Sequence, residues 1–349
     1  MTRLAVVVFN LGGPDAPAAV RPFLFNLFND PAIIGAPGPV RWLLAQFISR
    51  RRAPVAREIY RNLGGRSPLL ANTEAQANAL QRALQDRLGG CEARVFIAMR
   101  YWHPFAAETA AAVKAFAPDE VVLLPLYPQY STTTSGSSFD DWRRAAARAG
   151  LAAPTRTVCC YPTQAGFVEA VAARIRPMLE AAAAAQGRPR LLFSAHGLPK
   201  KIVAGGDPYQ WQVEQSAAAV AAALGDHALD WQICYQSRVG PLEWIGPSTE
   251  AEIARAGRDR VPVVLVPIAF VSEHSETLVE LDIEYRALAR AEGVPAYLRV
   301  PTVDCEPAFI AGLAELVGDM LARQAGCLCS QSGRRICPAE WRRCPMAAA

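Results

Sequence analysis

The stretch Arg190–Pro199, RLLFSAHGLP, decides the fold of this chain. Its first half is a short apolar run, and its second half is a loop with glycine and proline that opens at His196. Similar runs recur along the chain and alternate with alanine-rich stretches of helical pattern. Strands that are apolar at successive positions are typically buried on both faces, so the alternation predicts parallel βαβ units with helices on both faces. The runs begin at Leu4, Arg94, Val121, Arg190, Trp231 and Val261.

The same strand–loop pattern occurs twice. Val6–Pro14, VVVFNLGGP, resembles Leu191–Pro199, LLFSAHGLP. Two later motifs, RYWHP and LLPLYPQYS, have counterparts SRVGP and LVPIAFVSEHS in the same order. The alternative is that all buried parallel strands look alike. We expect an α/β protein of two similar Rossmann-like lobes, each a parallel sheet flanked by helices, with a cleft between them.

The 349 residues exceed the usual size of one hydrophobic core and suggest two domains. We expect a first α/β lobe over residues 1–150, with an insertion at about 20–70 that is first apolar and then rich in arginine. A second lobe, with the metal-site residues, is expected over 151–315. A C-terminal helix and a cysteine-rich tail are expected over 316–349.

Composition excludes several classes of protein. Apolar residues make up 52% of the chain and charged residues 19%, which is typical of a globular protein. The mild net charge of +4 neither demands nor excludes an anionic partner, and we expect no nucleic-acid partner. No GxGxxG, GxxxxGK[ST] or GxSxG motif is present, so dinucleotide binding, a P-loop and a hydrolase elbow lose their support. Neither a signal peptide nor a spanning helix is predicted, so we expect a cytoplasmic protein, in peripheral contact with the inner membrane.

Two features of the second half could carry chemistry. His196 follows a buried strand in a glycine–proline loop, where packing explains a histidine poorly, although a satisfied core histidine is the alternative. Glu273, Glu276, Glu280 and Glu284 are spaced by three, four and four residues, which predicts one acidic stripe on a helix. The alternative is a solvated acidic face. Carboxylates in a row favour a cation or protons between them.

The insertion suggests a large hydrophobic acid as ligand. Aromatic residues between Phe23 and Phe47 are followed by arginines from Arg50 to Arg66. Apolar walls with guanidinium groups suit a flat molecule that carries carboxylates. An ordinary helical hairpin with a basic outer face is the alternative.

These motifs together resemble the ferrochelatases of bacteria. LFSAHGLP, YQSRVGPLEWIGP and PIAFVSEHSETLVELDIEY carry the resemblance in the second half. NLGGP, YRNLGGRSP, RYWHP and LYPQYSTTTSGSS carry it in the first, so it runs from about Leu4 to about Leu316. The resemblance implies an enzyme that inserts Fe(II) into protoporphyrin IX in the terminal step of haem biosynthesis, with ferrous iron as substrate.

The resemblance also implies roles for individual residues. His196 and Glu276 match the catalytic and metal site of the family. Glu273, Glu280 and Glu284 resemble its acidic path for metal or protons. Leu11, Arg52, Tyr60, Ser67, Tyr127 and Trp244 match positions that contact the porphyrin. His196 would then accept pyrrole protons while the porphyrin is held out of plane.

The tail presents a separate question. Some family members hold a [2Fe–2S] cluster on C-terminal cysteines plus one internal cysteine. This tail has four of its own, Cys327, Cys329, Cys337 and Cys344, and Cys159 and Cys160 are internal candidates. A cluster and a disordered or disulfide-linked basic tail are both open.

Two rival functions are also open. One is another tetrapyrrole chelatase, which would use coproporphyrin or insert cobalt or nickel. The other is a porphyrin or haem carrier without catalysis, against which the presence of both His196 and Glu276 argues.

Overall fold

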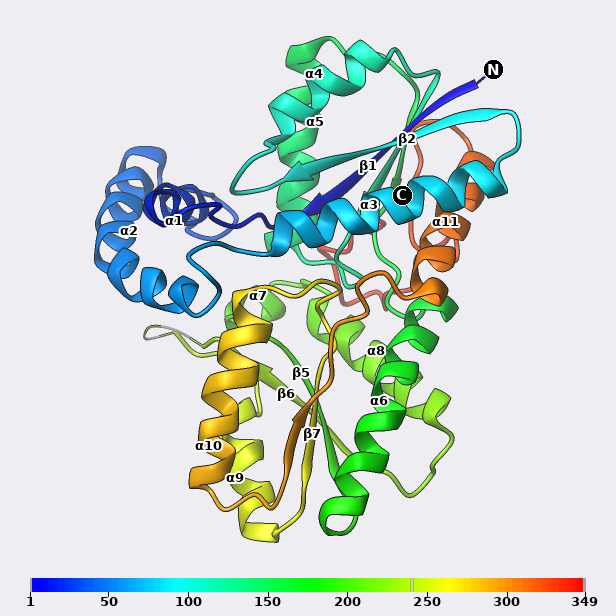
Figure 1. The fold of residues 1–349 in the computed structure, drawn as a ribbon. Helices are drawn as coiled ribbons and strands as arrows, with labels where there is room; N and C mark the ends of the chain where they lie inside the picture. Colours follow the sequence, from blue (N-terminus) through cyan, green and yellow to red (C-terminus); the bar gives the residue numbers. More distant parts are fainter. Residues whose placement is uncertain (1, 239, 241, 348–349) are drawn as a thin grey trace. The chain divides into compact units, whose positions relative to one another are not determined.

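The computed structural model describes residues 2–238, 240 and 242–347. Val239 and Pro241, which belong to the SRVGP motif, lie outside the described residues. The chain forms two compact units (Figure 1). Unit 1 consists of Met1–Cys160 and Ala314–Gly333, and unit 2 of Tyr161–Leu313 and Arg334–Ala349. The chain therefore passes from one unit to the other three times.

Unit 1 is built on a five-stranded parallel sheet in the order β2-β1-β3-β4-β9. The central strand β1 is buried from Leu4 to Asn10, as its unbroken apolar run predicts. Helices α4 and α5 pack against each other, and α3 packs on β2 (Figure 1). The strands are β1 (Thr2–Asn10), β2 (Cys91–Met99), β3 (Glu120–Pro125), β4 (Thr155–Val158) and β9 (Leu328–Cys329). The helices are η1 (Pro17–Ala19), α1 (Val20–Phe28), α2 (Gly38–Arg61), α3 (Leu69–Arg87), α4 (Ala106–Phe116), the π-helix η2 (Thr132–Gly136) and α5 (Ser137–Ala149).

Unit 2 is built on a four-stranded parallel sheet in the order β6-β5-β7-β8. Helices α6 and α8 cover one face of this sheet, and α9 and α10 cover the other (Figure 1). The strands are β5 (Arg190–His196), β6 (Asp230–Gln236), β7 (Val263–Pro267) and β8 (Tyr297–Arg299). The helices are α6 (Ala165–Gln186), α7 (Lys200–Ala204), α8 (Tyr209–Leu224), α9 (Thr249–Asp259), the π-helix η3 (Glu276–Glu284) and α10 (Tyr285–Ala291). Helix α11 (Pro307–Leu321) begins in unit 2 and ends in unit 1.

The two sheets share one topology, which confirms the predicted pair of similar lobes. The order β2-β1-β3-β4 in unit 1 corresponds to β6-β5-β7-β8 in unit 2, and every ladder is parallel. Unit 1 differs by the fifth strand β9 and by helices α1 and α2, which follow β1 and occupy the predicted insertion. Among the described helices, none is long and apolar enough to cross a membrane.

Candidate active site

His196 is the last residue of β5, which lies between β6 and β7 in the sheet of unit 2. The loop that follows turns sharply because Gly197 donates its backbone N–H to the carbonyl of Gln236 at 2.9 Å. A Cβ at Gly197 would lie 2.9 Å from that carbonyl oxygen and 3.2 Å from Cε3 of Trp244. Only glycine fits this close approach. The indole of Trp244, one of the predicted porphyrin contacts, therefore lies beside the loop of His196.

The imidazole of His196 is paired with Glu276, the first residue of η3. Nδ1 of His196 lies 2.9 Å from Oε2 of Glu276, although the two residues are 80 positions apart in the chain. The His196 side chain is 39% exposed and that of Glu276 is 25% exposed. In the described part of the chain, Nε2 of His196 has no hydrogen-bond partner. The pair therefore leaves one imidazole nitrogen available to a ligand.

Ser237 connects Glu276 to the next carboxylate of the helix. Its hydroxyl donates to Oε2 of Glu276 at 3.2 Å and also to Oε2 of Glu280. Its backbone N–H donates to Oε1 of Glu280 at 2.9 Å. Ser237 has a φ of 60°, a left-handed conformation that is rare for serine and is often found at functional sites. Gln236 adds a longer contact to Glu276 at 3.5 Å.

The environment shifts the pKa values of this group in different directions. Burial favours neutral His196, but the Glu276 carboxylate outweighs burial and raises the pKa of the imidazole. Burial likewise opposes ionisation of Glu276, but His196 lowers the pKa of Glu276 to about 2. Burial and the neighbouring Glu276 raise the pKa of Glu280. Of the two carboxyls, Glu280 is thus the one that more readily holds a proton.

The structure brings together only part of the predicted acidic stripe. Glu273 lies just before the helix and pairs with Arg299 on β8 at 2.6 Å, while Thr302 donates its N–H to the same oxygen. Glu284, the last residue of η3, is exposed. The segment is a π-helix rather than the α-helix that the spacing predicted, and π-turns are frequent at functional sites. Glu276 and Glu280 therefore form the cluster, and Glu273 belongs to a separate network.

Three of the predicted porphyrin contacts lie near one another in unit 1. Leu11 and Tyr60 belong to one apolar cluster, which also contains Phe28. The guanidinium of Arg52 lies 6.0 Å from the centre of the Phe28 ring. Arg52 is exposed on α2 and Tyr60 is buried. An apolar wall with an exposed guanidinium is the arrangement predicted for the insertion.

Ser67 and Tyr127 lie beside the loops that follow β1 and β3. Ser67 donates its N–H to the carbonyl of Pro14 at 2.7 Å. A Cβ at Gly13 would lie 2.5 Å from the Ser67 side chain, so this loop too requires glycine. Tyr127 follows β3, and burial raises the pKa of its hydroxyl.

Two further groups of polar residues follow predicted strands, but the sequence assigned them no role. Gln236 ends β6 and Ser237 follows it, a position that pointed to the site, but nothing in the sequence assigned them to Glu276 and Glu280. In unit 1, Arg100 pairs with the buried Asp30 at 2.8 Å and donates to Ser137 at 2.6 Å. Arg100 is the first residue after β2 and opens the RYWHP motif, so its position carried the same signal.

The tail cysteines lie in pairs. Sγ of Cys327 and Sγ of Cys329 are 3.7 Å apart in unit 1. In unit 2, a hydrogen bond from Cys337 lowers the pKa of Cys344 to about 6. All nine cysteines are free thiols. Within the described ranges, no group of three or more His, Cys, Asp or Glu side chains could hold a metal ion.

The fold is similar to that of solved chelatase structures. The structure of SirB from Bacillus subtilis with Fe³⁺ aligns with 92% of this chain and 96% of that chain, at a TM-score of 0.53 and 12% identity. The cobalt complex of the sirohydrochlorin chelatase SirB gives a TM-score of 0.51 over 92% and 95% of the two chains, at 10% identity. At this identity the likeness shows the fold alone.

Sequence relatives specify the family. The family model described as Ferrochelatase matches residues 3–321. The ferrochelatase of Caulobacter vibrioides is 57% identical over 346 residues, which covers 98% of this chain and 97% of the relative. That of Hyphomonas neptunium is 51% identical over 354 residues, covering 99% and 95%. The chain belongs to the ferrochelatase family.

Proposed function

We propose that this enzyme inserts ferrous iron into protoporphyrin IX to form haem. Family membership supports iron insertion into a porphyrin, and the observation that carries the chemistry is the pair of His196 and Glu276. The pair joins an imidazole and a carboxylate, with Nδ1 of His196 2.9 Å from Oε2 of Glu276, in side chains that are both partly open to solvent. Both are ligand types that a borderline divalent metal accepts.

His196 would act as the base that removes the pyrrole protons. In its neutral form, Nδ1–H donates to Glu276 and the lone pair of Nε2 is free to accept a proton. The carboxylate stabilises the imidazolium that forms, which is the reason for the raised pKa of His196. Insertion of one Fe²⁺ releases two protons from the porphyrin, so the base must be emptied during each turnover.

Glu276 and Glu280 would carry the second part of the reaction. Their shared hydrogen bonds to Ser237 place two carboxylates in series, one ionised and one with a raised pKa. Such a pair can pass a proton away from His196 or guide a cation toward it. In unit 1 we propose that the apolar wall with Arg52, Tyr60 and Leu11 contacts the porphyrin and that Arg52 pairs with a propionate.

An anaerobic assay tests this function. Purified protein is mixed with protoporphyrin IX and ferrous iron, and the Soret band is followed as the metalloporphyrin forms. Parallel reactions with coproporphyrin, and with Co²⁺ or Ni²⁺, separate the rival chelatases. We expect the highest kcat/KM with protoporphyrin IX and Fe²⁺. Porphyrin binding without turnover of any metal would identify a carrier instead.

We also propose that the enzyme binds membranes peripherally through α2. Large apolar side chains are exposed along this helix, and Leu43 and Phe47 are each 62% exposed. Arg50, Arg51 and Arg52 follow on the same helix and could meet anionic headgroups. Unpartnered apolar side chains on this scale favour a lipid surface, where an apolar porphyrin also partitions.

An iron–sulfur cluster on the tail stays a prediction. The 3.7 Å between the sulfur atoms of Cys327 and Cys329 suits two thiolates on one tetrahedral metal with bonds of about 2.3 Å. The lowered pKa of Cys344 favours a thiolate. Burial, in contrast, raises the pKa of Cys329 to about 11. A cluster needs four ligands, and the two pairs belong to different units of the chain.

A further inference from the structure

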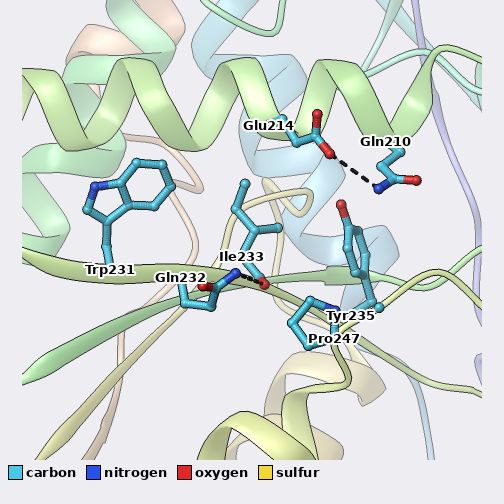
Figure 2. A pocket seen from close by; sticks show the side chains of 8 residues that line it. Gln210, Glu214, Trp231, Gln232, Ile233, Tyr235 and Pro247 are labelled. Carbon is cyan, nitrogen blue, oxygen red and sulfur yellow. Dashed lines mark hydrogen bonds between the residues drawn. The ribbon is translucent and has the colours of Figure 1, made fainter.

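A pocket on unit 2 has no part in the proposed reaction. It has a volume of about 350 Å³ and lies between helix α8 and the edge strand β6 (Figure 2). Because strand residues alternate between faces, Trp231, Ile233 and Tyr235 share the face of β6 that is turned toward α8. Gln210 and Glu214 on α8 form the opposite wall. The volume lies within the range of small-molecule sites.

The hydroxyl of Tyr235 needs a partner that the protein does not supply. The residue is 1% exposed, and among the residues that the structure describes its hydroxyl has no hydrogen-bond partner. In Figure 2 the hydroxyl is directed toward Gln210 and Glu214. Buried hydroxyl groups are rarely left unpaired. Burial also raises the pKa of Tyr235, so the group stays a phenol that can donate or accept a hydrogen bond.

The charge and the aromatic rings of the pocket point to a cation. Glu214 is the one charged residue that lines it, and across the described residues no basic side chain forms an ion pair with it. Gln210 donates to its Oε1 at 3.2 Å. The ring of Trp231, 37% exposed, adds an aromatic wall. A carboxylate next to aromatic rings is the arrangement that binds ammonium and guanidinium groups.

The backbone of β6 argues against an added peptide strand as the occupant. Pro247 already accepts the N–H of Tyr235 at 2.9 Å, and the Gln232 side chain already donates to the carbonyl of Ile233 at 3.0 Å. Two backbone groups of this edge strand are thus occupied. An added strand would need such groups free.

We propose that this pocket binds a small organic cation, an ammonium or guanidinium group carried on an apolar body. The cationic group would donate to the carboxylate of Glu214 and to the phenol oxygen of Tyr235. The apolar body would lie against Trp231 and Ile233. Neither His196 nor Glu276 lines this pocket.

Calorimetry and ligand-detected NMR with the full-length protein test this proposal. The probe is benzylammonium, and benzyl alcohol and benzoate serve as neutral and anionic probes of the same size. We expect benzylammonium to bind and the other two to bind at least tenfold more weakly. Glu214→Gln should weaken benzylammonium binding about tenfold, because it removes the charge and keeps the shape. Tyr235→Phe should also weaken it, because it removes the hydroxyl and keeps the ring.

Glu180→Gln is the matched control. Glu180 is an exposed carboxylate on α6, so its loss should leave the affinity unchanged. The proposal is overturned if benzylammonium does not bind, if benzyl alcohol binds equally well, or if Glu214→Gln has no effect. Iron insertion by the Glu214 and Tyr235 variants should equal that of wild type. Since the binding readout does not use this activity, the proposed function and this site can fail separately.

Discussion

The two ring nitrogens of His196 have different environments in unit 2. Nδ1 is fixed by Glu276 at 2.9 Å, while Nε2 is free among the described residues. With Nδ1 paired and a side chain that is 39% exposed, the ring can present Nε2 to a proton or a metal ion. The geometry therefore favours a chemical role.

His196→Ala should nearly abolish iron insertion while folding and porphyrin binding persist. Loss of a positioned base commonly lowers kcat by about 10²–10⁴-fold. The rate is measured by the Soret shift, and folding by circular dichroism. His227→Ala, at an exposed histidine outside the site, is the control. A rate within a few-fold of wild type would remove His196 from the mechanism.

NMR titration of the iron-free protein should separate its histidines. The pKa of His196 should lie above the ordinary value of about 6.5, since Glu276 outweighs burial. That of His274 should lie below it, because burial favours the neutral ring. Glu276→Gln should lower the pKa of His196. Two histidines that titrate together near 6.5 would contradict the described environments.

The raised pKa of His196 also determines how its contribution to stability changes with pH. The folded-state pKa of His196 exceeds its unfolded value, so its contribution to stability is present below pH ~6.5. This contribution is lost as the pH rises through the folded-state pKa. The partner, Glu276, stays ionised down to a pKa of about 2. Equilibrium unfolding of wild type and Glu276→Gln is measured from pH 5 to 9. The difference between their free energies of unfolding should become smaller at high pH.

At the scale of elements, the apolar runs predicted the longer strands but not the shortest ones. Strands β1, β2, β3, β5, β6 and β7 correspond to the six quoted runs. Strands β4, β8 and β9 have four residues or fewer, too few for a clear pattern. The pairing of β9 with β4 depends on a contact between residues about 170 positions apart. No local pattern encodes such a pairing.

The sequence located part of the candidate site, as it located part of the fold. Strand ends and glycine loops located His196, and the family motifs located Glu276. The separation of Glu273 from the acidic cluster was not predictable, because it depends on Arg299 from a strand that the sequence did not reveal. The π-helix was also missed, since periodicity alone does not distinguish one wide turn from an α-helix.

Helix α2 should bind vesicles through its exposed apolar residues. Wild type should float with liposomes that contain anionic lipid at low salt, because the helix would bury its apolar side chains and bring arginines to the surface. Trp42→Ser with Leu43→Ser should weaken flotation. Val263→Ala, at a buried strand position, is a control for a general loss of stability. Absence of wild-type flotation would contradict the proposal.

The tail cysteines should reveal a cluster by colour and composition. Protein purified anaerobically should show visible absorption and contain iron and acid-labile sulfide, as a [2Fe–2S] centre requires. Cys344→Ser should lose both, whereas Cys91→Ser, at a cysteine of β2, should keep both. A colourless protein with neither, yet fully active, would show that the tail thiols are not cluster ligands.

At the scale of the whole molecule, the last residues belong to unit 2. Arg343 donates its N–H to the carbonyl of Gly206 at 3.0 Å, and Gln212 donates to Sγ of Cys337 at 3.2 Å. Both Cys337 and Cys344 are buried. The tail is thus an integral part of this unit and packs near α7 and α8.

A chain that ends at Gly333 should loosen unit 2 and leave unit 1 unchanged. Loss of these contacts should cost about 1–2 kcal/mol locally, which speeds amide exchange about 5–30-fold. Hydrogen-exchange mass spectrometry should show the change in 200–224 and none in the β1 and β3 segments. Equal acceleration in both units would contradict the described division.

The threefold passage of the chain between the units has a consequence for synthesis on the ribosome. Residues 1–160 emerge first, yet the sheet of unit 1 lacks β9 until Leu328 and Cys329 have been made. Unit 2 in turn lacks Arg334–Ala349 until that segment has been made. The first-made unit therefore waits with an open sheet edge while Tyr161–Leu313 of the second unit are translated. Open edges invite wrong pairing, so a chaperone that shields nascent strands would matter most for this protein in that interval.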